Sequence, residues 1–227
     1  SALTLMHVCV DMFGGMLPAV FPVIREEFDL SITHGVWLLA LFGLLCNGVQ
    51  IASGHLRPHN SKPLLLPLGL LAASSLCWVA FLLRTDYPVV WLWTFVLLCG
   101  LGIGILHPEG LRGIYSLDRI PPTLATAVFI NGGLFAVGMW AWLGTLAVDK
   151  WELEGLLAFL PGPILCILLV YVLRIRLTVD QKPTEEPDSS SHDHLNAFFP
   201  ILLMSMPYAA SATIMMCLLP SALEELK

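Results

Sequence analysis

Charged residues are scarce in this sequence of 227 residues. Asp, Glu, Lys and Arg together make up 12% of the chain, whereas apolar residues make up 57%. Soluble domains contain about 25% charged and about 45–50% apolar residues, so a soluble fold could not bury this excess. The chain also lacks a basic arm or patch for nucleic acid, and much of its acidic charge lies in one connecting segment. The composition therefore excludes DNA or RNA binding and indicates a lipid bilayer as the solvent.

Paired cysteines are also lacking. The six cysteines all fall inside apolar runs, and none is spaced as C-x-x-C. A disulfide framework or a zinc site would need paired or clustered cysteines in polar segments. We therefore expect these residues to behave as small hydrophobic side chains.

Long apolar runs dominate what is present. A helix needs about 20 mostly apolar residues to cross a bilayer, and short polar breaks divide the chain into runs of that length. The sequence therefore predicts an all-α membrane protein with six consecutive spanning helices and a seventh after a longer break. The predicted spans are residues 3–24, 34–53, 64–83, 89–106, 124–148, 156–173 and 197–219.

The break before the seventh span is polar, acidic and rich in Pro and Ser, which is typical of a flexible linker. We divide the chain into a six-helix transmembrane bundle at 1–176, a cytoplasmic linker at 177–196 and the first helix of a second bundle at 197–227. The chain does not begin with Met and stops soon after the seventh span. We therefore expect a fragment whose pathway is completed by a C-terminal half or by a second subunit.

Lys and Arg are unevenly divided between the two ends of the predicted spans. Cytoplasmic loops are enriched in these residues. With a cytoplasmic N-terminus, seven of the eleven basic residues lie inside and four outside. The sequence thus predicts a multi-pass protein of the cytoplasmic (inner) membrane with its N-terminus in the cytoplasm.

Ionisable residues within spans are costly, and the first span contains two. His7 and Asp11 are four residues apart, so they share one face of a helix. The small residues at 14–15 on that side allow another helix to approach closely. Pro18 and Pro22 follow, and we expect them to break the helical hydrogen-bond ladder and free backbone carbonyls.

The fourth span ends in a second polar group. Glycines alternate over residues 100–104, which predicts a thin face for helix packing, and Pro108 is expected to bend the chain. His107, Glu109 and Arg112 follow, and Glu109 can pair with Arg112 three residues on. Two interpretations remain open: a functional charge cluster, or an ion pair that locks a loop at the cytoplasmic end of the helix.

Three uncharged polar residues lie in other spans. Asn47 and Gln50 belong to the second span, and Asn131, followed by Gly132 and Gly133, belongs to the fifth. Such amides commonly form hydrogen bonds between helices, and substrate contact is the alternative, most of all for Asn131.

Two motifs resemble a known family. H-V-C-V-D-M-F-G-G-M-L-P-A-V-F-P-V-I-R-E-E-F-D-L-S at residues 7–31 and H-P-E-G-L-R at residues 107–112 resemble the fosmidomycin-resistance-like efflux branch of the major facilitator superfamily. This resemblance implies two six-helix bundles that rock around a central cavity, and proton-driven export of a drug or another small solute. It favours a secondary transporter, an antiporter that needs no cofactor.

In this hypothesis Asp11 and Glu109 carry protons, Arg112 is the countercharge of Glu109, and His7 and His107 tune or relay the proton. The expected partners are protons, a small-molecule substrate and the lipid bilayer. Two other classes stay open: a non-transporting membrane sensor or scaffold, and an intramembrane enzyme that uses His7, Asp11, His107 and Glu109 around a metal.

Overall fold

The computed structural model describes residues 2–55, 63–115 and 120–177. These residues belong to one compact unit, Ser1–Thr178. The predicted seventh span and almost all of the predicted linker lie outside the described residues. All the described elements are helical. They are α1 (Ala2–Glu27), α2 (Ile32–His55), α3 (Leu65–Ala73), η1 (Ser74–Trp78), α4 (Val79–Leu82), α5 (Pro88–Ile114), α6 (Pro122–Trp151), η2 (Glu152–Phe159) and α7 (Pro161–Val172).

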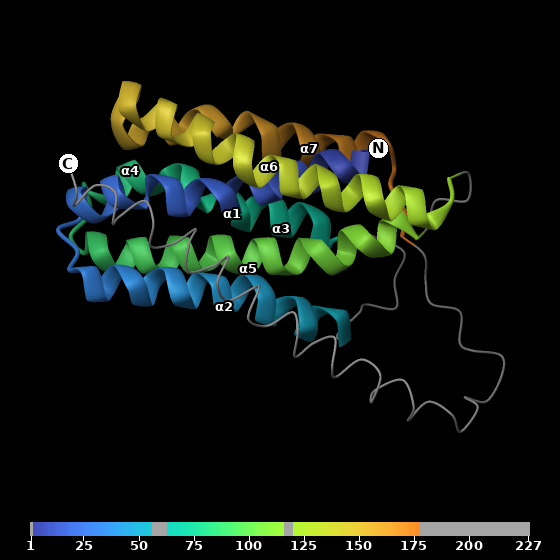
Figure 1. The fold of residues 1–227 in the computed structure, drawn as a ribbon, viewed down its shortest axis with the longest axis horizontal. Coiled ribbons are helices and arrows are strands. Elements are labelled where there is room, and N and C mark those ends of the chain that lie inside the picture. The colour runs from blue at the N-terminus through green and yellow to red at the C-terminus, as the bar shows by residue number, and fades with distance from the viewer. Residues whose placement is uncertain (1, 56–62, 116–119, 178–227) are drawn as a thin grey trace. The chain divides into compact units, whose positions relative to one another are not determined.

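Five stretches of the described chain are long and apolar enough to cross a membrane. The last of them, Pro122–Val172, has 51 residues, which is far more than one crossing needs. Figure 1 shows why: α6 runs the length of the bundle, and α7 returns alongside it after η2. The chain turns at Glu152, which has a φ of 54°. This stretch therefore contains both the fifth and the sixth predicted spans, and the predicted all-α membrane fold is confirmed.

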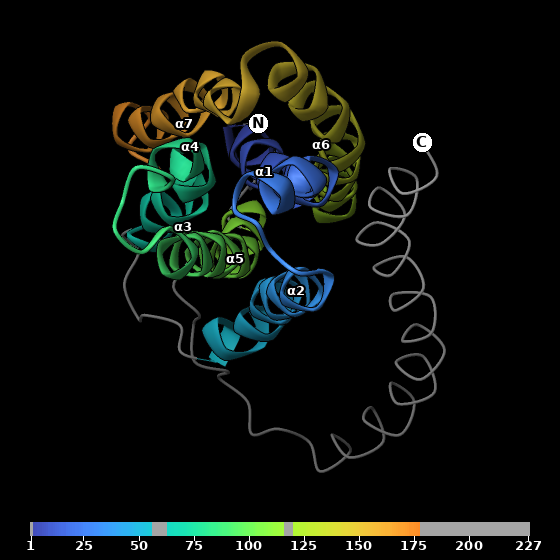
Figure 2. The ribbon, with the colours of Figure 1, turned by 90° about the vertical axis from the view of Figure 1, so that its left-hand side faces the viewer.

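α1 is the central helix of this unit. In the end-on view of Figure 2 it lies among α5, α6, α7 and the α3–α4 rod, whereas α2 packs beside α5 at the edge. Burial agrees, because 72% of the spanning window of α1 is buried but only 22% of that of α2. Polar groups on α1 are therefore enclosed by protein, where a partner can satisfy them.

Glycines set how closely the helices approach α1 and α5. A Cβ at Gly15 of α1 would collide with the backbone of Val137 in α6. The alternating glycines of the fourth span do not form one thin face but pack against two different helices. Gly100 and Gly104 lie against α2, and Gly102 lies against α3. The predicted tight packing is thus present, and it is divided between two sides of α5.

The prolines do not end their helices. α1 continues as an α-helix through Pro18 and Pro22, and α5 continues through Pro108 to Ile114. Each proline lacks an amide hydrogen and so removes one hydrogen bond of the helical ladder, yet the helix continues past it because neighbouring helices hold the rest in place. As a result, the polar residues after Pro108 lie on a helix and not in a loop.

Candidate functional site

Two histidines enclose one carboxylate at the contact of α1 and α5. His7 and Asp11 lie on α1, and His107 lies on α5. Nε2 of His7 is 3.1 Å from Oδ2 of Asp11, and Nε2 of His107 is 3.1 Å from Oδ1. Each histidine therefore faces a different oxygen of the same carboxyl group. We call these three residues the His–Asp–His cluster.

The other nitrogen of each ring lies within hydrogen-bonding distance of a backbone carbonyl. Nδ1 of His7 is 2.7 Å from the carbonyl oxygen of Phe129 in α6, and Nδ1 of His107 is 2.7 Å from that of Ile103 in α5. A carbonyl oxygen only accepts hydrogen bonds, so we assign a hydrogen to Nδ1 in both rings. In a neutral ring with this tautomer, Nε2 carries a lone pair and not a hydrogen.

This tautomer has a consequence for the contacts with Asp11. A lone pair on Nε2 would face the lone pairs of an ionised carboxylate, which is repulsive. A proton on either partner converts the contact into a hydrogen bond, and a charge-assisted one when the ring is the cation. Nε2 of His7 has no hydrogen bond of good geometry within the described chain, although it lies beside Asp11. The His–Asp–His cluster is thus built to hold at least one exchangeable proton.

α6 closes the cluster from its other side. The ring of Phe129 stacks on that of His7, with centroids 4.0 Å apart and planes at 5°, while His107 meets His7 edge-on at 4.8 Å. A Cβ at Gly133 would collide with the carboxylate of Asp11 and the ring of His7. Glycine at this position lets α6 lie directly against the two side chains.

The members of the cluster differ in exposure. The side chain of His7 is 5% exposed, that of Asp11 14% and that of His107 20%. The carboxylate is thus enclosed without being sealed, and His107 is its most accessible neighbour.

Glu109 and Arg112 form a second polar group on α5. Nη1 of Arg112 lies 3.3 Å from Oε1 and 3.4 Å from Oε2 of Glu109, and both side chains are buried. The predicted pairing three residues apart is therefore present in the helix itself. A buried pair of this kind neutralises two charges that would each be costly alone.

The structure does not bring the three predicted amides into the His–Asp–His cluster. Nδ2 of Asn47 donates to the Gly43 carbonyl, Nε2 of Gln50 to that of Cys46, and Nδ2 of Asn131 to that of Ala127. Each amide is thus tied to its own helix, one turn back. None of these three hydrogen bonds therefore joins two helices, although joining helices is the usual role of such residues.

The cluster is also the one group in the described part of the chain where three potential metal ligands lie close together. The ligand atoms of His7, Asp11 and His107 are within 4.8 Å of one another. Two imidazoles and a carboxylate are a donor set that divalent metals accept. Glu109, which we considered as a fourth ligand, pairs with Arg112 instead.

Sequence reasoning found the ionisable residues of the site but missed what holds them. The spacing of His7 and Asp11 predicted one shared face, and it is confirmed by their contact. The roles of the Phe129 carbonyl and of Gly133 were not predicted. The only signal was the glycine pair at 132–133, which indicated a close helix approach without naming the neighbour.

The described residues form a bundle of long apolar helices that places one carboxylate between two histidines, and the chain is similar to two proteins that are named for transport or resistance. The chain is 24% identical over 171 residues to the fosmidomycin resistance protein of Escherichia coli, covering 75% of the chain and 41% of that protein. It is 26% identical over 127 residues to the uncharacterized MFS-type transporter YfnC of Bacillus subtilis, covering 56% of the chain and 30% of that protein.

These two relatives confirm the resemblance to transporters of the major facilitator superfamily. Both are named as transport or resistance proteins and not as enzymes. The chain spans less than half the length of either relative. No family model matches the chain, and no solved structure matches it.

Proposed function

We propose that this chain is part of a proton-coupled secondary transporter that exports a small molecule by alternating access. The observation that carries the proposal is the His–Asp–His cluster. Its two Nδ1 atoms are occupied by carbonyls, so protons can enter and leave only between Nε2 and the carboxylate of Asp11. A proton that arrives there changes the charge at the centre of the bundle, where α1, α5 and α6 meet.

The buried pair of Glu109 and Arg112 is the proposed second proton site. When Glu109 takes up a proton it loses its charge, and the attraction between it and the guanidinium of Arg112 weakens. Because both side chains are buried, this weakening changes the packing of α5 against its neighbours. Such a pair can link protonation to the opening and closing of the cytoplasmic end.

Asn47, Gln50 and Asn131 are the proposed substrate contacts. Each amide donates one hydrogen bond to its own helix, which leaves its carbonyl oxygen and one N–H for another partner. Asn47 and Asn131 are exposed at the surface of the described unit. A second bundle, from a C-terminal half or a second subunit, would enclose a small polar or amphipathic molecule against them.

Export and drug resistance are proposed from the name of one relative, the fosmidomycin resistance protein. Fosmidomycin is accordingly the first probe for this chain. We further propose residence in the cytoplasmic membrane with the N-terminus inside, because the basic residues favour that side.

Flux through proteoliposomes tests the proposal. A pH gradient is expected to drive fosmidomycin transport by the reconstituted transporter that contains this chain. Asp11→Asn and Glu109→Gln are each expected to abolish the pH dependence because an amide at that position cannot take up or release the coupled proton. Pairing Asn47→Ala with Asn131→Ala should raise the substrate concentration needed for half-maximal flux.

Two other outcomes favour the rival classes. Binding of the probe without flux would favour a sensor or scaffold. A stoichiometric divalent metal that leaves on replacement of His7 or His107 would favour a metal centre, because the ligand atoms of the cluster lie close enough to hold one.

A further inference from the structure

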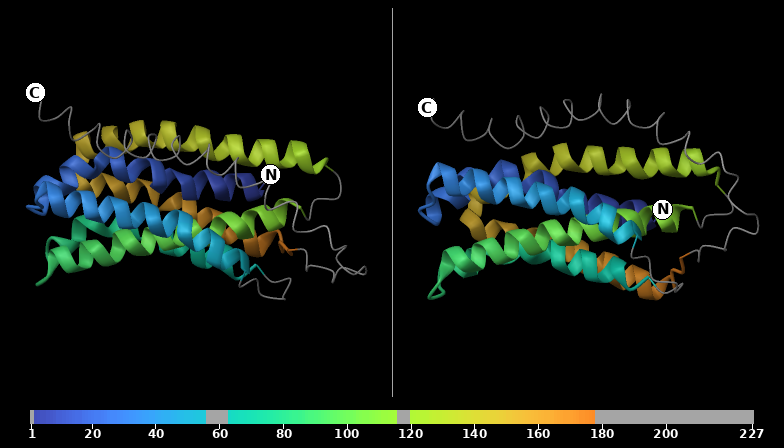
Figure 3. Two further views of the ribbon diagram at one scale, coloured as in Figure 1. Left: turned by 60° about the horizontal axis from the view of Figure 1, so that its bottom comes forward. Right: turned by 90° about the horizontal axis from the view of Figure 1, so that it is seen from below.

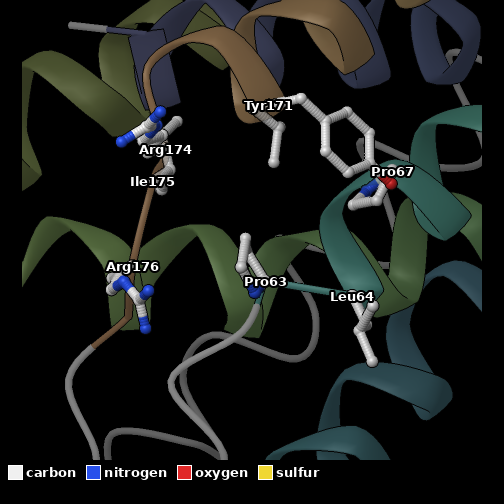
Figure 4. Close-up of a pocket in the computed structure, with 8 residues that line it drawn as sticks. Pro63, Leu64, Pro67, Tyr171, Arg174, Ile175 and Arg176 are labelled. Atoms are coloured by element: carbon white, nitrogen blue, oxygen red, sulfur yellow. The ribbon is translucent and has the colours of Figure 1, made fainter.

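A cavity of about 260 Å³ opens at the end of the bundle, between the start of α3 and the end of α7. Figure 4 shows its two walls: Pro63, Leu64 and Pro67 on one side, and the segment that carries Arg174, Ile175 and Arg176 on the other, with the ring of Tyr171 pointing toward Pro67. Apolar and aromatic side chains thus line the part that faces the membrane spans, and two guanidinium groups lie at its mouth.

The two arginines mark the boundary of the apolar region. No charged residue lies between Glu154 and Arg174, so these are the first charges after the sixth span. Both side chains are exposed. In the described part of the chain neither guanidinium is paired with a carboxylate. Exposed arginines that directly follow an apolar span are suited to contact the layer of lipid headgroups.

The backbone of Arg174 is unusual for an arginine. α7 ends with hydrogen bonds from the Arg174 amide to Tyr171 and from the Ile175 amide to Val170, and Arg174 has a φ of 48°. This is the left-handed position at which helices usually place glycine, because other residues are disfavoured there by about 1–2 kcal/mol.

We propose that this cavity binds an anionic phospholipid. The phosphate lies between Arg174 and Arg176, and the part of an acyl chain nearest the headgroup lies against Tyr171, Pro67 and Leu64. A basic pocket between spanning helices at the headgroup layer is the arrangement that selects acidic lipids. A free anion would use the arginines but not the apolar wall, so the lining favours a lipid. The site is separate from the His–Asp–His cluster and does not depend on the proposed transport.

Arg174→Gly is the most informative variant, because it separates folding from binding. Glycine suits the left-handed position, so thermal stability in detergent should be unchanged or higher. Affinity for phosphatidylglycerol, measured by native mass spectrometry of the purified protein, should fall about five-fold, the effect of one basic residue at a membrane surface. Arg176→Gln should lower it by a similar factor. Phosphatidylcholine should bind weakly to all variants.

Asp29→Gly is the matched control. Asp29 follows α1 and has the same φ of 48°; its amide donates to the Glu26 carbonyl, and the next amide, that of Leu30, donates to the Arg25 carbonyl. This glycine should leave phosphatidylglycerol binding unchanged. Unchanged binding in both arginine variants, an equal loss in Asp29→Gly, or equal affinity for phosphatidylcholine would each overturn the proposal. So would competition by inorganic phosphate at the same concentration as the lipid, which would assign the site to a free anion.

Discussion

Residues of three helices surround the carboxylate of Asp11. Two histidines face its oxygens, a phenylalanine stacks on one of the histidines, and a glycine of a third helix lies directly against it. The carbonyls of Phe129 and Ile103 decide which nitrogen of each ring faces the carboxylate. A hydrogen bond from one ring nitrogen to a backbone carbonyl fixes the orientation and the tautomer of a histidine.

Gly133→Ala tests this packing at the scale of one methyl group. The added Cβ would collide with Asp11 and His7, so we expect a loss of about 1–3 kcal/mol in stability and of pH-driven flux. Gly138→Ala on the same helix meets nothing within 4 Å and should be neutral or slightly stabilising. Thermal unfolding in detergent and proteoliposome flux measure the two effects. Equal behaviour of the two variants would contradict the close approach of α6.

The cluster could be predicted from sequence only in part. Spacing along one helix joins His7 to Asp11, because residues four apart are neighbours on any helix. His107 is about one hundred residues away, and only the packing of α5 on α1 brings it to the second oxygen. The Phe129 carbonyl could not be predicted at all, since every residue has one and its direction follows from the tertiary fold.

At the scale of elements, the apolar runs predicted where helices lie better than where they end. The predicted fourth span stopped at residue 106, before the polar residues, but α5 continues to Ile114. Polar residues end an apolar run, but they do not end a helix when their side chains find partners, as those of Glu109 and Arg112 do. This extension is what places His107 opposite Asp11.

The turn between α6 and α7 gives a second prediction. Glu152 has φ 54° and ψ −156°, a region that is nearly confined to glycine and costs other residues about 1–3 kcal/mol. Glu152→Gly should therefore raise stability by about 1 kcal/mol in thermal unfolding. Glu152→Ala removes the same charge without relieving the backbone, so it should give no gain. A gain of the same size in both variants would point to charge and not to conformation.

At the scale of the molecule, the described unit has two distinct ends. The end that carries the start of α1 also carries the end of α7 and its two arginines, as Figures 1 and 3 show. The other end carries the exposed ion pair of Arg84 and Glu154, 3.1 Å apart. Exposed pairs of this kind contribute about 0–1 kcal/mol to stability and weaken with salt. The different charges at the two ends therefore bear on how the protein is oriented in the membrane more than on how stable it is.

Labelling of introduced cysteines tests the proposed orientation. Asp86 and Tyr115 are both exposed, and they lie at opposite ends of α5. With the N-terminus inside, a membrane-impermeant maleimide should label Asp86→Cys in intact cells and should label Tyr115→Cys only after the cells are opened. The reverse pattern would invert the topology. The unmodified protein serves as the control for its own cysteines, of which four in the described residues are buried.

Proton coupling through Asp11 is the central claim, and flux under an imposed pH gradient tests it most directly. Unmodified protein in proteoliposomes should move fosmidomycin at a rate that rises with the gradient. Asp11→Asn keeps the size of the side chain but cannot carry the proton, so its flux should no longer respond to the gradient. A response to pH that is retained in Asp11→Asn would contradict the account.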